Sequence, residues 1–265
     1  MIQQLINEAL LAKQAERSKR ERSGKFSPSM FGRCYRAQIW DRKNEEVTNP
    51  PDERALRVFA VGNIFHDWIQ SYLPKHDCEV LIETEDIKGY ADIVFDDCVT
   101  DLKTMHSKGF WWMAKSNYDM KKEKLPNILQ VCAYAWLLNK PKASLCFISK
   151  DDLCINEYPL DVKEWIPAVE LELKALRYFW AEAKLPPALP RCYMQVDGTS
   201  KECGYCSFSI GGKCKKGDFV FCDICGLPLI IDGECARKHK RTTLRQNIGK
   251  YSGNSEKVKG GYENS

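Results

Sequence analysis

The stretch that most constrains the fold is residues 87–104, which read Ile-Lys-Gly-Tyr-Ala-Asp-Ile-Val-Phe-Asp-Asp-Cys-Val-Thr-Asp-Leu-Lys-Thr. This stretch is typical of a β-hairpin with Asp96 and Asp97 in the turn. Counting back along the ladder from that turn places Asp92 opposite Asp101. Directly opposed side chains lie roughly 5 Å apart at Cβ, and like charges there destabilise the pair unless something neutralises them. A divalent cation would do so.

Strand alternation adds Lys103 to the same face, because it lies two residues beyond Asp101. The opposite face would carry Ala91, Ile93, Phe95, Cys98, Thr100 and Leu102. We therefore expect one core face and one polar site. Asp-Asp is a weaker two-residue turn than Asn-Gly, so a longer loop with a shifted register is one alternative. An ordinary solvated hairpin face is another.

The 265 residues allow one sizeable domain with appendages, and the net charge of +4 permits an acidic partner without requiring one. No apolar run is long enough to span a membrane and no signal peptide is visible, so we expect a cytoplasmic protein. Thirteen cysteines in a reducing compartment do not indicate a disulfide framework. Six of them fall between Cys203 and Cys235, which indicates metal binding.

The rest of the chain alternates between helical and extended patterns. Apolar spacing predicts helices over residues 55–72, 127–139 and 161–184, and strands over 79–85, 143–149 and 154–160, the last at an edge. The Ser27-Pro28-Ser29 stretch suits a helix start, and prolines at 186–190 mark a linker. Phe110, Trp111 and Trp112 are expected to cover the sheet, with a base-stacking lip as the alternative.

The C-terminal cysteines form two modules. Cys203, Cys206 and Cys214 supply three thiolates, one short of a closed site. Cys222, Cys225, Cys235 and His239 satisfy a tetrahedral Cys3His zinc site by themselves. Alternatively, all six cysteines pool into two zinc knuckles or one distorted ribbon. In each case metal would hold this end together, because it has almost no core of its own.

Taken in order, the motifs resemble the PD-(D/E)XK nuclease superfamily, specifically the RecB-like iron-sulfur exonucleases that include the CRISPR-associated adaptation nuclease. The resemblance covers roughly residues 26–214. Its parts are Ser27-Pro28-Ser29 with Cys34 and Arg36, Gly62-x3-His66, Gly89-x2-Asp92, Asp101-x-Lys103, Gln130-x3-Tyr134 and Cys203-x2-Cys206-x7-Cys214. It implies an α/β restriction-endonuclease-like core, a mixed central sheet flanked by helices. Asn127 departs from the family, since a histidine is expected just before the Gln130 helix, and the Cys3His module lies outside the family core.

The resemblance also implies roles for these residues. Cys34 would join Cys203, Cys206 and Cys214 on a [4Fe-4S] cluster. Asp92, Asp101, His66 and the Leu102 carbonyl would bind Mg²⁺ or Mn²⁺. Lys103 would orient the attacking water or offset phosphate charge, while Gln130 and Tyr134 would hold Lys103 or the DNA backbone. Glu85 is a weaker candidate, because it could equally be a solvated strand end.

The resulting prediction is a metal-dependent DNA exonuclease that acts on single-stranded or frayed ends in replication, recombination or CRISPR adaptation, in a prokaryotic or phage-infected cell. The alternative is a non-catalytic nucleic-acid-binding protein with structural zinc modules. Phosphate contacts would come from basic residues, with a solvated charged surface as their alternative role: Arg33, Arg36, Lys121, Lys122, Lys124, Arg237, Lys238, Lys240 and Arg241.

The predicted domain organisation has five parts. They are a charged helix over 1–24, the nuclease core over 25–190, the iron-sulfur region over 191–217 together with Cys34, the zinc module over 218–239 and a disordered basic tail over 240–265. Nothing in the sequence identifies a protein partner.

Overall fold

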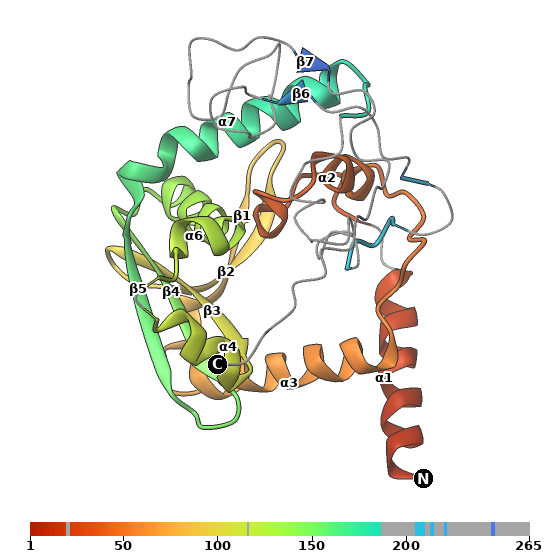
Figure 1. Ribbon diagram of the computed structural model, residues 1–265, viewed down its shortest axis with the longest axis vertical. Coiled ribbons are helices and arrows are strands. Elements are labelled where there is room, and N and C mark those ends of the chain that lie inside the picture. Colours follow the sequence, from red (N-terminus) through yellow and green to blue (C-terminus); the bar gives the residue numbers. More distant parts are fainter. Residues whose placement is uncertain are drawn as a thin grey trace, which may run out of the picture.

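The computed structural model describes residues 1–19, 22–115, 117–186, 205–209, 213–214, 220–221 and 245–246. Its centre is a five-stranded sheet in the order β1-β2-β3-β4-β5 (Figure 1). The strands are β1 (Cys78–Glu83), β2 (Lys88–Val94), β3 (Cys98–Met105), β4 (Lys142–Ser149) and β5 (Ile155–Asp161). Neighbouring strands are antiparallel except β3 and β4, which are parallel. The predicted mixed α/β architecture with flanking helices is therefore present.

The hairpin of β2 and β3 has the predicted register. Ile93 pairs with Thr100 and Val94 with Val99, and the Phe95 N–H donates to the Cys98 carbonyl at 2.8 Å. The two aspartates between them form the turn. Asp97 is paired there with Lys142 at 2.7 Å, so a lysine from β4 offsets the charge of an intrinsically weak turn sequence.

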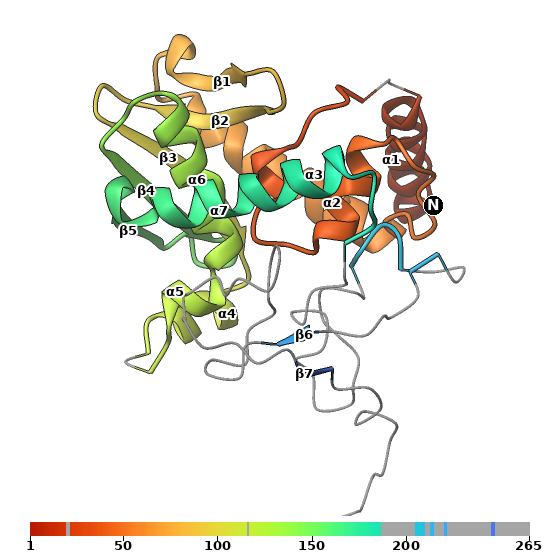
Figure 2. The same cartoon turned by 90° about the horizontal axis from the view of Figure 1, so that it is seen from above.

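Helices fill the crossover between the parallel strands, as parallel pairing requires. They are α4 (Ser107–Met113), α5 (Met120–Glu123) and α6 (Leu125–Leu137). Residues 128–135 of α6 are all buried, because α6 contacts β3 and β4 on one side and α7 (Val162–Ala181) on the other. Figures 1 and 2 show α7 lying across α6, outside the sheet.

The opposite face of the sheet is also buried, under α3 (Glu53–Gln70). A second apolar cluster lies there, formed by Ile93, Leu102, Cys146 and Ile148 with Phe65, Ile69 and Leu73 packed against it. Burying a Leu or Ile side chain contributes about 1.5–3 kcal/mol. The expected core face is present, and the face of the expected polar site is covered as well: Val99 and Asp101, on the α6 side of β3, are as buried as Leu102 on the α3 side.

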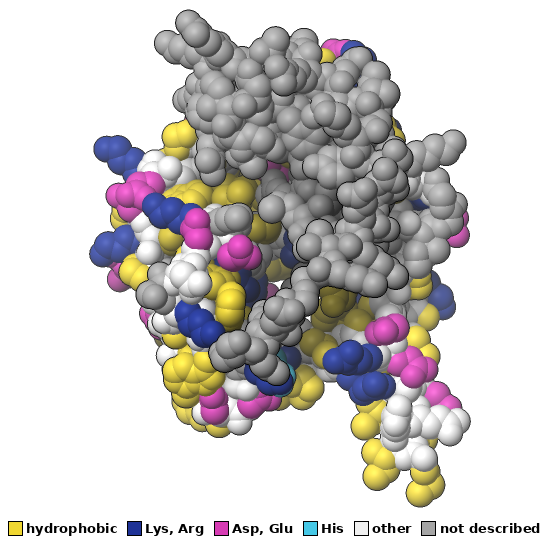
Figure 3. Space-filling model, viewed as in Figure 1, with side chains coloured by type: hydrophobic (Ala, Val, Ile, Leu, Met, Phe, Trp, Pro, Cys, Tyr) yellow, Lys and Arg dark blue, Asp and Glu magenta, His cyan; other side chains and the backbone are white. Residues whose placement is uncertain are grey.

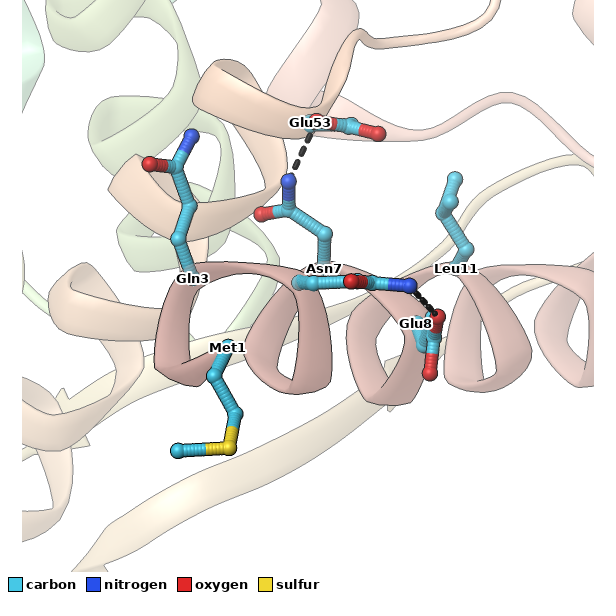
Figure 4. Close-up of a pocket in the computed structure, with 7 residues that line it drawn as sticks. Met1, Gln3, Asn7, Glu8, Leu11 and Glu53 are labelled. Carbon is cyan, nitrogen blue, oxygen red and sulfur yellow. Dashed lines mark hydrogen bonds between the residues drawn. The ribbon is translucent and has the colours of Figure 1, made fainter.

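The N-terminal helix α1 (Ile2–Ser18) lies against the start of α3 and extends away from the sheet (Figure 1). Asn7 is the buried residue of this contact. Its side-chain amide donates to Glu53, and its carbonyl accepts from Arg57. Figure 4 shows Asn7 and Glu53 beside a pocket at this junction. Side-chain hydrogen bonds between α1 and α3 thus fix the position of α1, the predicted charged helix.

The segment before the sheet contains a short 3-10 turn η1 (Pro28–Met30) and helix α2 (Tyr35–Arg42). Pro28 therefore begins only a single turn, and the helix proper starts seven residues later. Buried Glu172 of α7 accepts hydrogen bonds from the Gly32 N–H, the Tyr35 hydroxyl and the Gln38 amide at 2.7–3.0 Å. This carboxylate joins the N-terminal segment to α7.

The sequence-based elements are present with small shifts of their ends. The largest shift is at α1, which ends at Ser18 where the charged helix was predicted to reach residue 24. α7 ends at Ala181 where the pattern predicted 184, and β5 is an edge strand as expected. A 3-10 turn η2 (Lys75–Asp77) precedes β1, and the two-residue strands β6 (Val220–Phe221) and β7 (Arg245–Gln246) pair with each other. In the part of the chain that the structure describes, no helix is both long enough and apolar enough to cross a membrane.

Candidate metal site at the open end of the hairpin

The hairpin register brings Asp92 opposite Asp101, but ordinary pairing stops one residue short of them. The ladder between β2 and β3 ends at Ile93 and Thr100. Beyond it, the Leu102 N–H donates to the Asp92 carboxylate at 2.7 Å instead of to a backbone carbonyl. The Asp92 side chain therefore lies where β2 and β3 separate, and a backbone N–H of β3 holds its carboxylate in place.

Asp92 and two side chains from two other elements lie together at this point. His66 of α3, Glu79 of β1 and Asp92 of β2 each present one ligand atom, and these atoms all lie within 4.8 Å of one another. His66 Nδ1 is 3.9 Å from Asp92 Oδ2. One imidazole and two carboxylates form a donor set that suits a divalent cation with nitrogen and oxygen ligands.

Glu79 is a residue that the sequence reasoning missed. The β1–β2 register pairs Cys78 with Ile93 and Val80 with Ala91, which places Glu79 opposite Asp92. The weaker candidate Glu85 lies beyond the other end of β1, so it takes no part in this site. The sequence signal that could have found Glu79 was the strand register: extending the count from the hairpin to β1 places Glu79 opposite Asp92.

Asp101 is the most deeply buried member of the site, with 2% of its side chain exposed. Burial raises the pKa of its carboxyl to about 7; Lys103 opposes that change and the negative charge of Asp92 adds to it. Oδ1 accepts from Lys103 Nζ at 2.7 Å, whereas buried Oδ2 has no hydrogen-bond partner among the described residues. A buried oxygen of this kind is costly to leave unmatched, so the carboxylate is fitted to a cation or a proton.

Lys103 lies at the boundary between the buried acid and solvent. Its side chain is 30% exposed, and Nζ also contacts the Leu102 carbonyl at 3.3 Å. That carbonyl is the backbone oxygen expected to act as a ligand. The predicted alternation is therefore present, with the amine on the same side of β3 as Asp101.

Tyr134 of α6 reaches the same region from above the sheet. A Cβ added at Gly89 would lie 2.5 Å from its hydroxyl oxygen, so only glycine leaves room for this ring over β2. The pKa of Tyr134 is raised by burial and then by the charges of Asp101 and Asp92. Gln130, one turn earlier on α6, is buried as well. The structure thus brings Tyr134 to the acids, and the predicted role of Gln130 stays a prediction.

Gly62 lies on α3 where the helix faces β3, one turn before His66. A Cβ at this position would meet Thr104 Oγ1 of β3 at 3.5 Å, an ordinary contact distance. A methyl group would therefore fit, and the structure shows no close approach that requires glycine, although glycine is unfavourable inside a helix.

Two of the three C-terminal cysteines of the predicted cluster lie in described segments. Cys34 is the buried N-cap residue of α2, and Cys206 and Cys214 pack against the apolar cluster that contains it. The Arg36 guanidinium, in the first turn of α2, is 3.8 Å from Cys214 Sγ. Cys203 and all four residues of the expected zinc module, Cys222, Cys225, Cys235 and His239, lie outside the described residues.

The aromatic and basic candidates divide into structural and exposed groups. Phe110 is buried, but Trp111 and Trp112 are about half exposed, so only the first of the three covers the sheet. Arg36 donates to the Pro186 carbonyl at 2.6 Å and is engaged within the fold. Lys121 is exposed beside Glu164 at 3.7 Å. Figure 3 shows acidic and basic side chains interspersed over the described part of the face it displays.

No protein-family model matches the chain, and no curated protein matches its sequence. The crystal structure of SSO0001 is similar with a TM-score of 0.48 and 20% identity, covering 81% of this chain and 98% of that one. The crystal structure of LHK-Exo in complex with dAMP has a TM-score of 0.38 and 15% identity, covering 60% of this chain and 93% of that one. A crystal structure of the alkaline exonuclease LHK-Exo from Laribacter hongkongensis has a TM-score of 0.35 and 13% identity, with the same coverage of the two chains. These likenesses are too distant to carry a functional argument.

Proposed function

We propose that the chain is a metal-dependent nuclease that hydrolyses phosphodiester bonds of DNA. The observation that carries the proposal is the Asp101 carboxylate, buried beside Lys103 with one oxygen unmatched. It lies next to Asp92, which belongs to a cluster of potential metal ligands with His66 and Glu79. A protein core rarely keeps such an acid without a use, and perturbed carboxyl groups cluster at functional sites.

Asp92, Asp101 and His66 would hold Mg²⁺ or Mn²⁺, with the Leu102 carbonyl as a backbone ligand. The bound ion would polarise the phosphate and lower the pKa of a water molecule. The chain prepares its ligands in advance: the Leu102 N–H fixes Asp92 and Lys103 fixes Asp101. Little side-chain freedom would then be lost when the site is filled.

Lys103 is suited to the reacting phosphate because it is the partly exposed cation of the site. Its ammonium group would orient the attacking water or offset charge on the phosphate, while its contact with Asp101 keeps it in place. The buried Tyr134 hydroxyl, with its raised pKa, stays protonated and can donate a hydrogen bond. Gln130 would assist from the preceding turn, holding Lys103 or the DNA backbone.

We infer a DNA end as the substrate, single-stranded or frayed, read through its backbone and not its bases. The proposal draws on the motif order, because the residues of the site would act on the phosphate group, which every nucleic acid shares. Exposed residues such as Arg33 and Lys121 are available for phosphate contacts. Binding through such contacts should weaken steeply as salt rises.

A [4Fe-4S] cluster on Cys34, Cys203, Cys206 and Cys214 is proposed alongside the nuclease site. What supports it is the packing of Cys206 and Cys214 against the apolar cluster of Cys34, together with an arginine donating toward Cys214. Hydrogen bonds to cluster sulfurs are a common feature of such centres. A zinc ion on Cys222, Cys225, Cys235 and His239 remains a further proposal.

The test of the nuclease proposal compares Asp101→Asn with Asp97→Asn in the full chain. Asp97 is an exposed turn residue in a surface ion pair, so its replacement should change little. We expect Asp101→Asn to lose Mg²⁺- or Mn²⁺-dependent degradation of end-labelled single- and double-stranded DNA, and Asp97→Asn to retain it. Equal degradation by the two variants, or none by the wild type with any divalent ion, would overturn the proposal.

A further inference from the structure

Glu79 adopts a backbone conformation that its surroundings must enforce. Its φ angle is 50°, in the left-handed region that residues with a Cβ rarely occupy. Such conformations are energetically costly and persist where the neighbouring structure requires them, often at functional sites. Here the unusual residue stands opposite Asp92 in the ladder, at the position nearest the site.

Gln70, the last residue of α3, connects Glu79 to the strand that carries Asp92. Its amide donates to Glu79 Oε1 at 3.1 Å and to the Asp92 backbone carbonyl at 3.0 Å. His66 lies one turn earlier on the same helix face. One helix therefore contributes an imidazole to the site and also holds the carboxylate that β1 contributes.

The acids would repel one another unless a positive charge lay between them. Glu79 and Asp92 share one ligand group with His66. Asp101, opposite Asp92 in the hairpin register, keeps a buried oxygen without a hydrogen-bond partner among the described residues. A cation in this group would bind oxygens and a nitrogen at once. These observations are independent of one another, since they come from a backbone angle, a set of distances and an unmatched buried atom.

We propose that Glu79 is a further protein ligand of the divalent ion and that Gln70 is its positioning residue. The inference rests on the metal site of the proposed function. It also assigns a preference to that site. Mg²⁺ demands near-ideal octahedral geometry from hard oxygen ligands and keeps several waters, so an imidazole nitrogen in the ligand group disfavours it more than it disfavours Mn²⁺. The chain should therefore bind Mn²⁺ more tightly than Mg²⁺.

The experiment measures Mn²⁺ binding to the full chain by the electron paramagnetic resonance signal of the free ion, with Mg²⁺ added as competitor. The variants are Glu79→Gln, which keeps size and removes charge, and Gln70→Ala, which removes the positioning amide. Glu157→Gln is the matched control, because Glu157 is an exposed glutamate of β5, at the other edge of the sheet. Thermal unfolding in EDTA checks that each variant is folded.

We expect Glu79→Gln to weaken Mn²⁺ binding by about tenfold or more and Gln70→Ala by a smaller factor, with Glu157→Gln unchanged. Unfolding temperatures in EDTA should stay close to that of the wild type for all three. Wild-type affinity in Glu79→Gln would overturn the inference, even if the protein degrades DNA. Weakened binding in Glu79→Gln without any DNA degradation by the wild type would instead remove the proposed function and keep the ligand.

Discussion

Asp101 is enclosed by protein on nearly every side, and this burial raises the pKa of its carboxyl to about 7, against 3.8 for a free side chain. Its Lys103 neighbour lowers the pKa by less than burial raises it, because the amine is itself partly in water. Without metal the carboxyl is therefore partly protonated near neutral pH. An acid in this state exchanges a proton for a cation when the site fills.

The raised pKa sets the sign of a stability change with pH. The folded chain holds the Asp101 proton more tightly than the unfolded chain does, so this group favours folding most below about pH 4. The stabilisation that this group contributes falls as pH rises from about 4 to about 7, and it is absent at higher pH. In EDTA, the free energy of unfolding of the wild type should fall by up to a few kcal/mol between pH 4 and 8 relative to that of Asp101→Asn. Urea unfolding of both proteins measures this difference. Parallel pH curves for the two proteins would contradict this.

At the scale of elements, the site depends on the contact between α6 and the β2 strand. Gly89 lies beneath the Tyr134 ring, and the added Cβ would also come within 3.0 and 3.1 Å of two ring carbons. Tyr134 is buried, so its ring has little room to move. The contact keeps α6 close enough for the hydroxyl to lie beside the acids.

Gly89→Ala should therefore destabilise the protein by about 1–3 kcal/mol, as overpacking of a filled core does. The Tyr134→Phe change should restore part of the loss, because it removes the nearest atom. Thermal or urea unfolding of the single and double variants measures both effects. Gly109→Ala in α4 is the control: its Cβ would meet only the flexible end of Met105, and alanine favours a helix more than glycine does. Equal effects of the two alanine variants would contradict the packing argument.

At the scale of the whole molecule, segments far apart in sequence lie together around α2. The Thr48 and Asn49 N–H groups both donate to the Ser207 carbonyl at 2.9 Å. Trp40 packs against Phe208 with centroids 5.5 Å apart and ring planes tilted by 58°. Residues 205–209 thus return to the N-terminal part of the chain. Ligation of Cys34 with Cys206 would close a loop of more than 150 residues, and closing a long loop removes entropy from the unfolded chain.

The proposed cluster would make the protein brown when it is purified without oxygen. We expect Cys34→Ser to lose the visible iron-thiolate absorbance and the bound iron, and to unfold at a lower temperature. Cys154→Ser, a half-buried cysteine outside the predicted ligand set, should keep all three properties. A colourless anaerobic wild type that contains only zinc would support the pooled-zinc alternative instead.

The hairpin, its register and the Asp92, Asp101 and Lys103 set follow from the sequence alone, because a turn and a two-residue alternation fix which side chains oppose each other locally. The same local counting could not show that both faces of β3 are buried, because this depends on the long-range packing of α6 on one side of the sheet and α3 on the other.

Glu79 and Gln70 were found only in the tertiary structure. The placement of Glu79 depends on a third strand and on a left-handed backbone angle, and that of Gln70 on where α3 ends over β2. Ladder counting extended to β1 would have placed Glu79 opposite Asp92, but it could not have shown the left-handed angle of Glu79 or its contact with α3. The sequence therefore determined which groups could bind a cation, and the packing of α3 against β1 and β2 decided which of them meet.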